Sequence, residues 1–163
     1  MKLKFKTGII VGVLSGMGIS HIAHKKMETT QQQENKVDKF KKYYQLLNHW
    51  LILKQCNVNL SDFFSNHSYQ RVAIYGMGEL GERLYSEIKN NVEVIYGIDQ
   101  NKQGKRSELQ IVLDEECLDP VDVIVVTAIF DFDKIEKKLR KKCDYDIISL
   151  KDIVTELEYE KLH

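Results

Sequence analysis

The chain has 163 residues, which is room for one domain with an appendage but not for two full domains. Its 24 lysines and arginines balance its 24 aspartates and glutamates, so no broad basic surface is available for a nucleic-acid backbone. Cys56, Cys117 and Cys143 stand far apart, without the spacing of a zinc site or a disulfide framework, and we expect reduced thiols.

An uncharged and largely apolar segment lies near the N-terminus, at residues 7–23. It is at the short limit of a membrane-spanning helix, which needs about 17 to 25 residues. Gly8, Gly12 and Gly16 recur every four residues and would line one helix face, a pattern that lets membrane helices approach closely. We therefore expect residues 1–27 to form a single-pass membrane anchor. A signal peptide is an alternative, although no Ala-x-Ala type of cleavage site is evident, and a loosely held tail is another.

The lysines around this segment bear on its orientation. Three lysines precede it, and six follow it within about 20 residues. Positive charge favours the cytoplasmic side of a membrane, so we expect the main domain to face the cytoplasm. A cytoplasmic protein without an anchor is the alternative.

Residues 28–68 are predicted to form a linker and a helical hairpin. The linker has no apolar residue from Glu28 to Asn35. Apolar residues then recur every three or four positions, which predicts an amphipathic helix up to Lys54, and a short second helix follows from about Leu60. The apolar stripe of the first helix comprises Val37, Phe40, Tyr43, Tyr44, Leu46, Leu47, Trp50 and Leu51. We expect this stripe to pack against the following sheet; self-association or base stacking are alternative roles.

A Gly-x-Gly-x-x-Gly motif joins a short apolar strand, residues 71–75, to the next helix. Gly76 would let the backbone turn sharply, Gly78 would leave room for a pyrophosphate, and Gly81 would let the helix pack closely on the sheet. Unpaired N–H groups at the helix start would face the phosphates. The alternative is a turn that keeps its glycines only for packing.

A second strand, residues 92–98, ends in Asp99, where a dinucleotide-binding fold places its ribose-binding carboxylate. This carboxylate would accept hydrogen bonds from a ribose diol and repel a 2′-phosphate, which favours NAD over NADP. Lys102, Lys105 and Arg106 in the next loop would soften that preference. The candidate ligand contacts are Gly76, Met77, Gly78, Glu79, Leu80, Gly81, Asp99 and Thr127.

Strands and helices alternate through the rest of the chain. We expect helices at residues 79–89 and 133–142, a short segment at 109–113, a strand at 146–150 and a C-terminal helix. Residues 121–127 form an almost unbroken β-branched run, typical of a central parallel strand covered on both faces. Residues 69–163 are thus predicted to form a compact α/β domain, a Rossmann-like parallel sheet of about five strands.

The sequence leaves catalysis open. Tyr85 and Lys89 have the Tyr-x-x-x-Lys spacing of short-chain dehydrogenases. They fall on the helix that directly follows the glycine motif, behind the phosphate loop, and we treat the match as coincidence. No histidine in the Rossmann-like section is available as a general base, because His67 precedes the first strand and His163 ends the chain.

Residues 75–81, 96–101 and 123–127 resemble small Rossmann domains that accompany bacterial surface-polysaccharide biosynthesis, relatives of nucleoside-diphosphate-sugar epimerases and dehydratases. A similar plan forms the nucleotide-sugar-binding N-terminal domain of bacterial sugar acetyltransferases. The resemblance covers roughly residues 69–154 and implies Gly76, Gly78, Gly81 and Asp99 as ligand contacts. The substrate-holding domain and the active Tyr and Lys of the full enzymes are lacking.

This resemblance implies an accessory or regulatory module of polysaccharide or glycan biosynthesis that binds NAD(H) or a nucleotide-sugar, with NADP also possible. We expect a protein partner or a homo-oligomer. One alternative is an epimerase-like or oxidoreductase enzyme completed by a partner chain. Another is a degenerate scaffold that binds only protein.

Overall fold

The computed structural model of this protein describes residues 33–100, 108–113 and 119–162. The chain divides into two compact units, Met1–Tyr44 and Gln45–His163. The expected membrane anchor, residues 1–27, lies outside the described residues. Within the described residues, no helix has the length and apolar character needed to cross a membrane.

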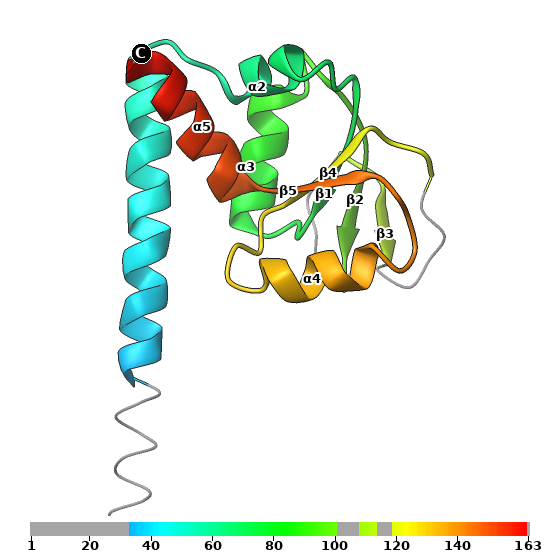
Figure 1. Cartoon of the computed structure of the whole chain (residues 1–163), viewed down its shortest axis with the longest axis horizontal. Helices are drawn as coiled ribbons and strands as arrows, with labels where there is room; N and C mark the ends of the chain where they lie inside the picture. The colour runs from blue at the N-terminus through cyan, green and yellow to red at the C-terminus, as the bar shows by residue number, and fades with distance from the viewer. Residues whose placement is uncertain (1–32, 101–107, 114–118, 163) are drawn as a thin grey trace, which may run out of the picture. The chain divides into compact units, whose positions relative to one another are not determined.

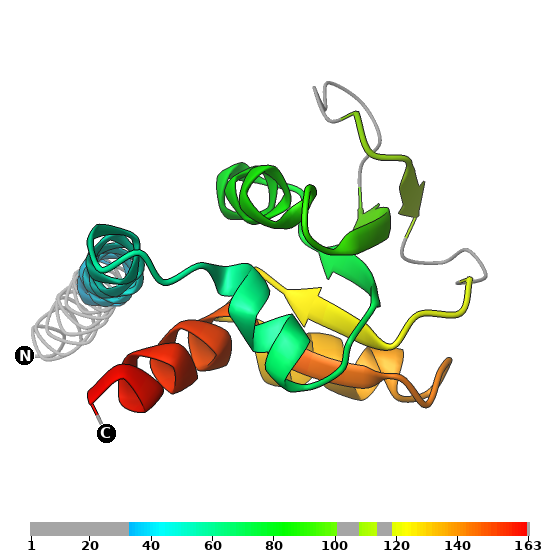
Figure 2. The ribbon, with the colours of Figure 1, turned by 90° about the horizontal axis from the view of Figure 1, so that it is seen from above.

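Five parallel strands form a single sheet in the second unit (Figure 1). The strands are β1 Arg71–Tyr75, β2 Glu93–Asp99, β3 Ile111–Leu113, β4 Val123–Val126 and β5 Asp146–Ser149. Their order is β3-β2-β1-β4-β5, which Figure 2 shows from β3 at the upper right to β5 at the bottom. The prediction of an α/β domain with about five parallel strands is confirmed.

The chain leaves β1 toward β2 and β3 on one side, and then returns to the other side of β1 to form β4 and β5. The strand order therefore reverses between β1 and β4. In open parallel sheets, ligands bind at such a reversal, in the crevice outside the carboxyl ends of the strands. The topology therefore predicts a ligand site at the carboxyl ends of β1, β2 and β4.

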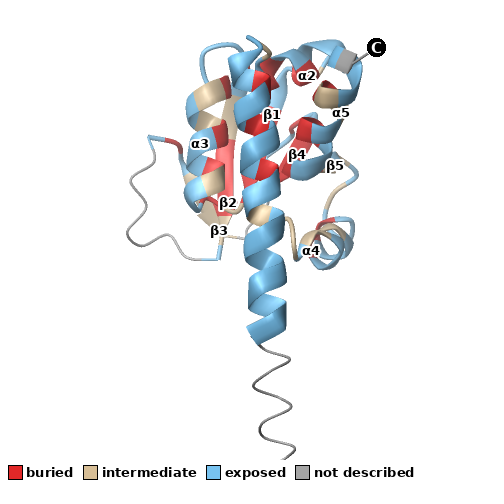
Figure 3. Cartoon of the chain, turned by 90° about the vertical axis from the view of Figure 1, so that its left-hand side faces the viewer, coloured by how far each residue is buried: buried red, intermediate tan, exposed pale blue. Residues whose placement is uncertain are grey.

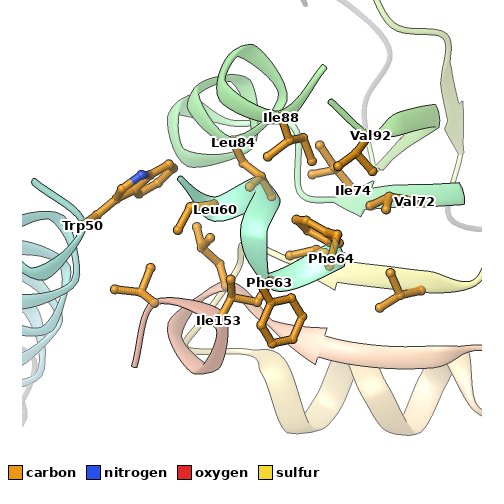
Figure 4. Close-up of a cluster of buried hydrophobic side chains, with 14 of the residues drawn as sticks. Trp50, Leu60, Phe63, Phe64, Val72, Ile74, Leu84, Ile88, Val92 and Ile153 are labelled. Atoms are coloured by element: carbon orange, nitrogen blue, oxygen red, sulfur yellow. The ribbon is translucent and has the colours of Figure 1, made fainter. Parts of the chain in front are cut away.

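Helices enclose the sheet from both sides, as its sequence pattern requires. They are α2 Leu60–Asn66, α3 Glu79–Ile88, α4 Phe132–Leu139 and α5 Leu150–Leu162. One core cluster joins Phe64 of α2, Leu84 of α3 and Ile153 of α5 to one face of the sheet (Figure 4). The other cluster joins Ile135 and Leu139 of α4 to the opposite face. All four residues of β4 are buried, as predicted for a strand covered on both faces.

Residues 45–68 belong to the same compact unit as the sheet. The first predicted helix is present over residues 33–55, and α2 is the short second one. Leu46, Trp50 and Leu53 of the first helix are part of the core cluster around α2, α3 and α5.

The apolar stripe of the first helix is divided between buried and exposed positions (Figure 3). Leu46 and Trp50 are buried, whereas Phe40 is 75% exposed and Leu51 is 55% exposed. Val37, Tyr44 and Leu47 are also exposed. The prediction that the whole stripe packs against the sheet is therefore wrong. Two neighbouring rows of apolar residues lie about 100° apart around this helix, and only the row that contains Leu46 and Trp50 is buried.

A single carboxylate connects three helical segments around this core. Glu87 of α3 accepts hydrogen bonds from Trp50 Nε1 at 2.8 Å and from the backbone N–H of Leu60 at 2.8 Å. Lys54 Nζ lies 3.2 Å from the same carboxylate. The side chain of Glu87 is only 11% exposed, so water cannot easily replace it as an acceptor for these donors.

We predict that Glu87→Ala lowers the free energy of unfolding by about 2 to 3 kcal/mol, because two donors lose a charged acceptor. Urea unfolding of the full chain measures this change. Glu82→Ala is the matched control on the same helix, where the side chain is exposed, and we expect a loss below about 1 kcal/mol. Equal losses for the two variants would show that Glu87 does not connect the helices.

Candidate functional site

The turn after β1 requires glycine at its first position. Gly76 has a φ of +91°, in the left-handed region that side chains disfavour. A Cβ atom at Gly76 would also lie 2.8 Å from Thr127 Oγ1. The amide of Gly76 donates to the carbonyl of Ile98 at 2.8 Å, so the turn begins while the chain is still bonded to β2.

The third glycine of the motif is required by helix packing. A Cβ atom at Gly81 would lie 2.3 Å from the carbonyl oxygen of Gly76, far inside any allowed contact. The first turn of α3 therefore rests directly on the turn that precedes it. The sequence predicts close packing of this helix on the sheet, and the close contact that Gly81 permits is with the turn that follows β1.

The second glycine is not required by the protein itself. Gly78 is the N-cap of α3, with φ −82° and ψ −163°, an extended conformation that any residue adopts. No atom lies within 4 Å of a Cβ atom built at this position. Packing within the chain accounts for Gly76 and Gly81, but it does not account for Gly78.

Asp99 ends β2 and braces the glycine turn. Its Oδ2 accepts the backbone N–H of Met77 at 2.9 Å. The Met77 side chain is buried in the core and fills the space above Gly97, where a Cβ atom would lie 2.6 Å from Met77 Cγ. Asp99 and Met77 are both predicted ligand contacts. Asp99 lines the cleft at the carboxyl edge of the sheet, whereas the Met77 side chain is buried in the core.

Thr127 follows β4 and also supports the turn. Its hydroxyl lies within donating distance of the carbonyls of Tyr75, at 3.1 Å, and Gly76. Its backbone N–H donates to Tyr75 at 2.9 Å, and the residue is only 4% exposed. The structure thus brings Thr127 to the site, where its hydroxyl contacts the carbonyls at the start of the turn.

The remaining candidates lie at the start of α3. Gly78 and Glu79 are exposed, and Leu80 is half-buried against the core. Glu79 lines a separate open pocket along α3, together with Lys54 and Arg83. The carboxylate of Glu79 is therefore not part of the cleft at the carboxyl edge of the sheet.

A cleft of about 400 Å³ lies at the carboxyl ends of β1, β2 and β4. Its described lining is Tyr75, Gly76, Asp99, Gln100, Ala128, Asp131, Lys134, Ile135 and Lys138. The volume is within the range of small-molecule sites, about 300 to 1,000 Å³. Sequence reasoning did not select the three residues from α4. The signal that could have found them is a pair of lysines four positions apart beside an apolar residue, on the helix after the central strand.

The displaced pKa values belong to structural contacts at the other end of the strands. Asp122, just before β4, accepts the backbone N–H groups of Gln70 and Arg71, and these bonds hold the pKa of its carboxyl below the usual value. Burial, with a hydrogen bond to Asp146, raises the pKa of Tyr69 to about 12. Asp122 connects the amino ends of the neighbouring strands β1 and β4, and Tyr69 connects the segment before β1 to the start of β5, both away from the cleft.

Comparison with known proteins gives no match to any protein-family model, curated protein or solved structure. Among the described residues, no group of three or more His, Cys, Asp or Glu side chains is placed to hold a metal ion.

We predict opposite sensitivities for two glycines of one motif. Gly81→Ala should lower the free energy of unfolding by at least about 2 kcal/mol, because the new methyl group collides with a backbone carbonyl. Gly78→Ala should cost less than about 1 kcal/mol, since only an N-cap preference is lost. Chemical denaturation of both variants measures the difference. Similar losses at the two positions would contradict the assignment of Gly78 to a role outside packing.

Proposed function

We propose that this chain is a Rossmann-like nucleotide-binding module that takes NAD(H) or a nucleotide-sugar at the carboxyl edge of its sheet. Its strand order, β3-β2-β1-β4-β5, matches the first five strands of dinucleotide-binding folds. The glycine turn follows β1, and an acidic residue ends β2, as those folds require. The cleft lies between these two features.

The observation that carries the proposal is the glycine at position 78, for which packing gives no reason. A side chain there would stand in the space that a pyrophosphate occupies at the start of the helix. The first N–H groups of a helix have no partner within it, and they favour an anion. An exposed glycine at the N-cap of α3 keeps these groups accessible.

The acidic residues of α3 do not oppose this proposal. Glu79 and Glu82 lie in its first turn, where negative charge stabilises the helix dipole but would repel a phosphate. Both line the open pocket along α3 that also contains Lys54, and neither lines the cleft. Neither carboxylate is therefore part of the surface that the cleft presents to a ligand.

Binding without independent catalysis is supported by the position of Tyr85 and Lys89. Lys89 caps the C-terminal end of α3, about 16 Å along the helix from Gly78. Its Nζ bonds Glu108 and lies 5.4 Å from the centre of the Tyr85 ring. These two residues have structural partners far from the glycine turn, which favours a binding module over a dehydrogenase.

The biological role we propose is an accessory or regulatory subunit in bacterial polysaccharide or glycan biosynthesis, tethered to the membrane through residues 1–27 and facing the cytoplasm. The glycine turn and the two following strand ends resemble those of small Rossmann domains that accompany surface-polysaccharide biosynthesis, and this resemblance supports the role. An enzyme completed by a partner chain is the second candidate. The exposed apolar row on the first helix favours association with a protein partner or a second copy in either case.

The proposal is tested by a charge placed at position 78 in the full chain. Asp is a preferred N-cap residue, so Gly78→Asp should fold normally while its carboxylate repels the phosphates. Thermal unfolding with NAD, NADP and a UDP-sugar measures binding. For the original chain, a ligand at one hundred times its Kd should add about 2.7 kcal/mol of stability, and Gly78→Asp should abolish the gain.

Gly78→Asn is the matched control, because it has the same shape and capping ability without the charge. We expect weaker loss of binding in Gly78→Asn than in Gly78→Asp. Stabilisation of Gly78→Asp equal to that of the original chain would contradict the proposed site. The absence of any response to all three nucleotides would contradict the proposed function.

A further inference from the structure

Two lysines of α4 form one wall of the cleft. Lys134 and Lys138 are four residues apart, so they lie one above the other on the same side of the helix. Ile135 and Leu139 are buried against the sheet and fix the rotation of α4. Lys134 and Lys138 therefore stand at the edge of the buried face, beside the ligand space.

These lysines neutralise the negative charge of the cleft lining. The described lining also contains two carboxylates, those of Asp99 and Asp131, so its formal charges balance. Without the two ammonium groups, the lining would have a net negative charge and would exclude an additional phosphate. Both lysines are exposed, and no hydrogen bond or ion pair is made by Lys134 within the part of the chain that the structure describes.

Asp99, whose carboxylate would repel a 2′-phosphate, also forms a hydrogen bond within the protein. One oxygen of Asp99 accepts the Met77 N–H, so part of its negative charge is neutralised by the turn. Asp99 alone favours NAD over NADP, and the positive charges of the α4 lysines oppose that preference. Lys102, Lys105 and Arg106, which would soften that preference, lie outside the described residues.

The geometry points to a ribose-phosphate subsite at Lys134 and Lys138, so that the cleft takes NADP at least as tightly as NAD despite Asp99. This inference rests on the proposed nucleotide site. A basic side chain near the acid at the end of the second strand is the feature that accommodates a 2′-phosphate in dinucleotide folds. Here the basic groups come from α4, across the cleft from β2.

Calorimetric titration of the full chain with NAD and with NADP tests the subsite. We expect the Kd of NADP to be equal to or lower than that of NAD. The double variant Lys134→Gln with Lys138→Gln should raise the Kd of NADP by at least about tenfold and that of NAD by less than about threefold. Lys137→Gln with Lys141→Gln is the matched control, outside the cleft lining, and should change neither Kd.

Asp99→Asn provides the opposite change, because its amide oxygen still accepts the Met77 N–H while the negative charge is lost. It should lower the Kd of NADP relative to that of NAD. A Kd of NADP about tenfold above that of NAD in the original chain, or a ratio unchanged by the double lysine variant, would overturn the subsite. Binding of a UDP-sugar with neither dinucleotide would overturn the subsite and leave the nucleotide site standing. Failure of all three would overturn both.

Discussion

The direct contact between the start of α3 and the turn after β1 is the constraint on which the site depends. It exists because Gly81 has no side chain at a point 2.3 Å from the carbonyl of Gly76. With the helix seated there, its N-terminus lies at the carboxyl edge of the sheet. Asp99 from β2 then bonds the turn at Met77, and Thr127 after β4 supports it from the other side. Three neighbouring strand ends are thereby held in one arrangement.

Two glycines of the motif are needed to build the turn, whereas the remaining one, Gly78, leaves the start of α3 accessible. Gly76 and Gly81 are explained by backbone conformation and contact, and a folded protein of any function would need them. Gly78 is explained by neither, since its backbone is extended and no atom lies within 4 Å of a Cβ built there, and we propose that it leaves room for a ligand. The same distinction applies to the acidic groups, because Asp99 lines the cleft while Glu79 lies along a different surface of α3. A mixed Asp and Lys lining suits a polar, phosphorylated ligand.

The strands, helices and glycine turn could be predicted because their signals are local. The β-branched run around β4 and the spacing of the three glycines each specify their own conformation. The bond between Asp99 and Met77 could not be predicted, because it depends on how β2 aligns with β1 in three dimensions. Lys134 and Lys138 were missed for a similar reason, since the rotation of α4 on the sheet decides which of its lysines face the cleft. The division of the apolar stripe also depended on packing, which buried one of two equivalent rows.

We propose that the glycine turn and the residues after β4 bind one nucleotide together. Amide-resolved NMR titration of the full chain with a nucleotide tests it most directly, because each backbone N–H reports separately. We expect the largest shifts at the amides of Gly78, Glu79 and Leu80, with a second group at residues 128–131. Shifts confined to other surfaces, such as residues 82–87 of α3, or no shifts at saturating nucleotide, would contradict it.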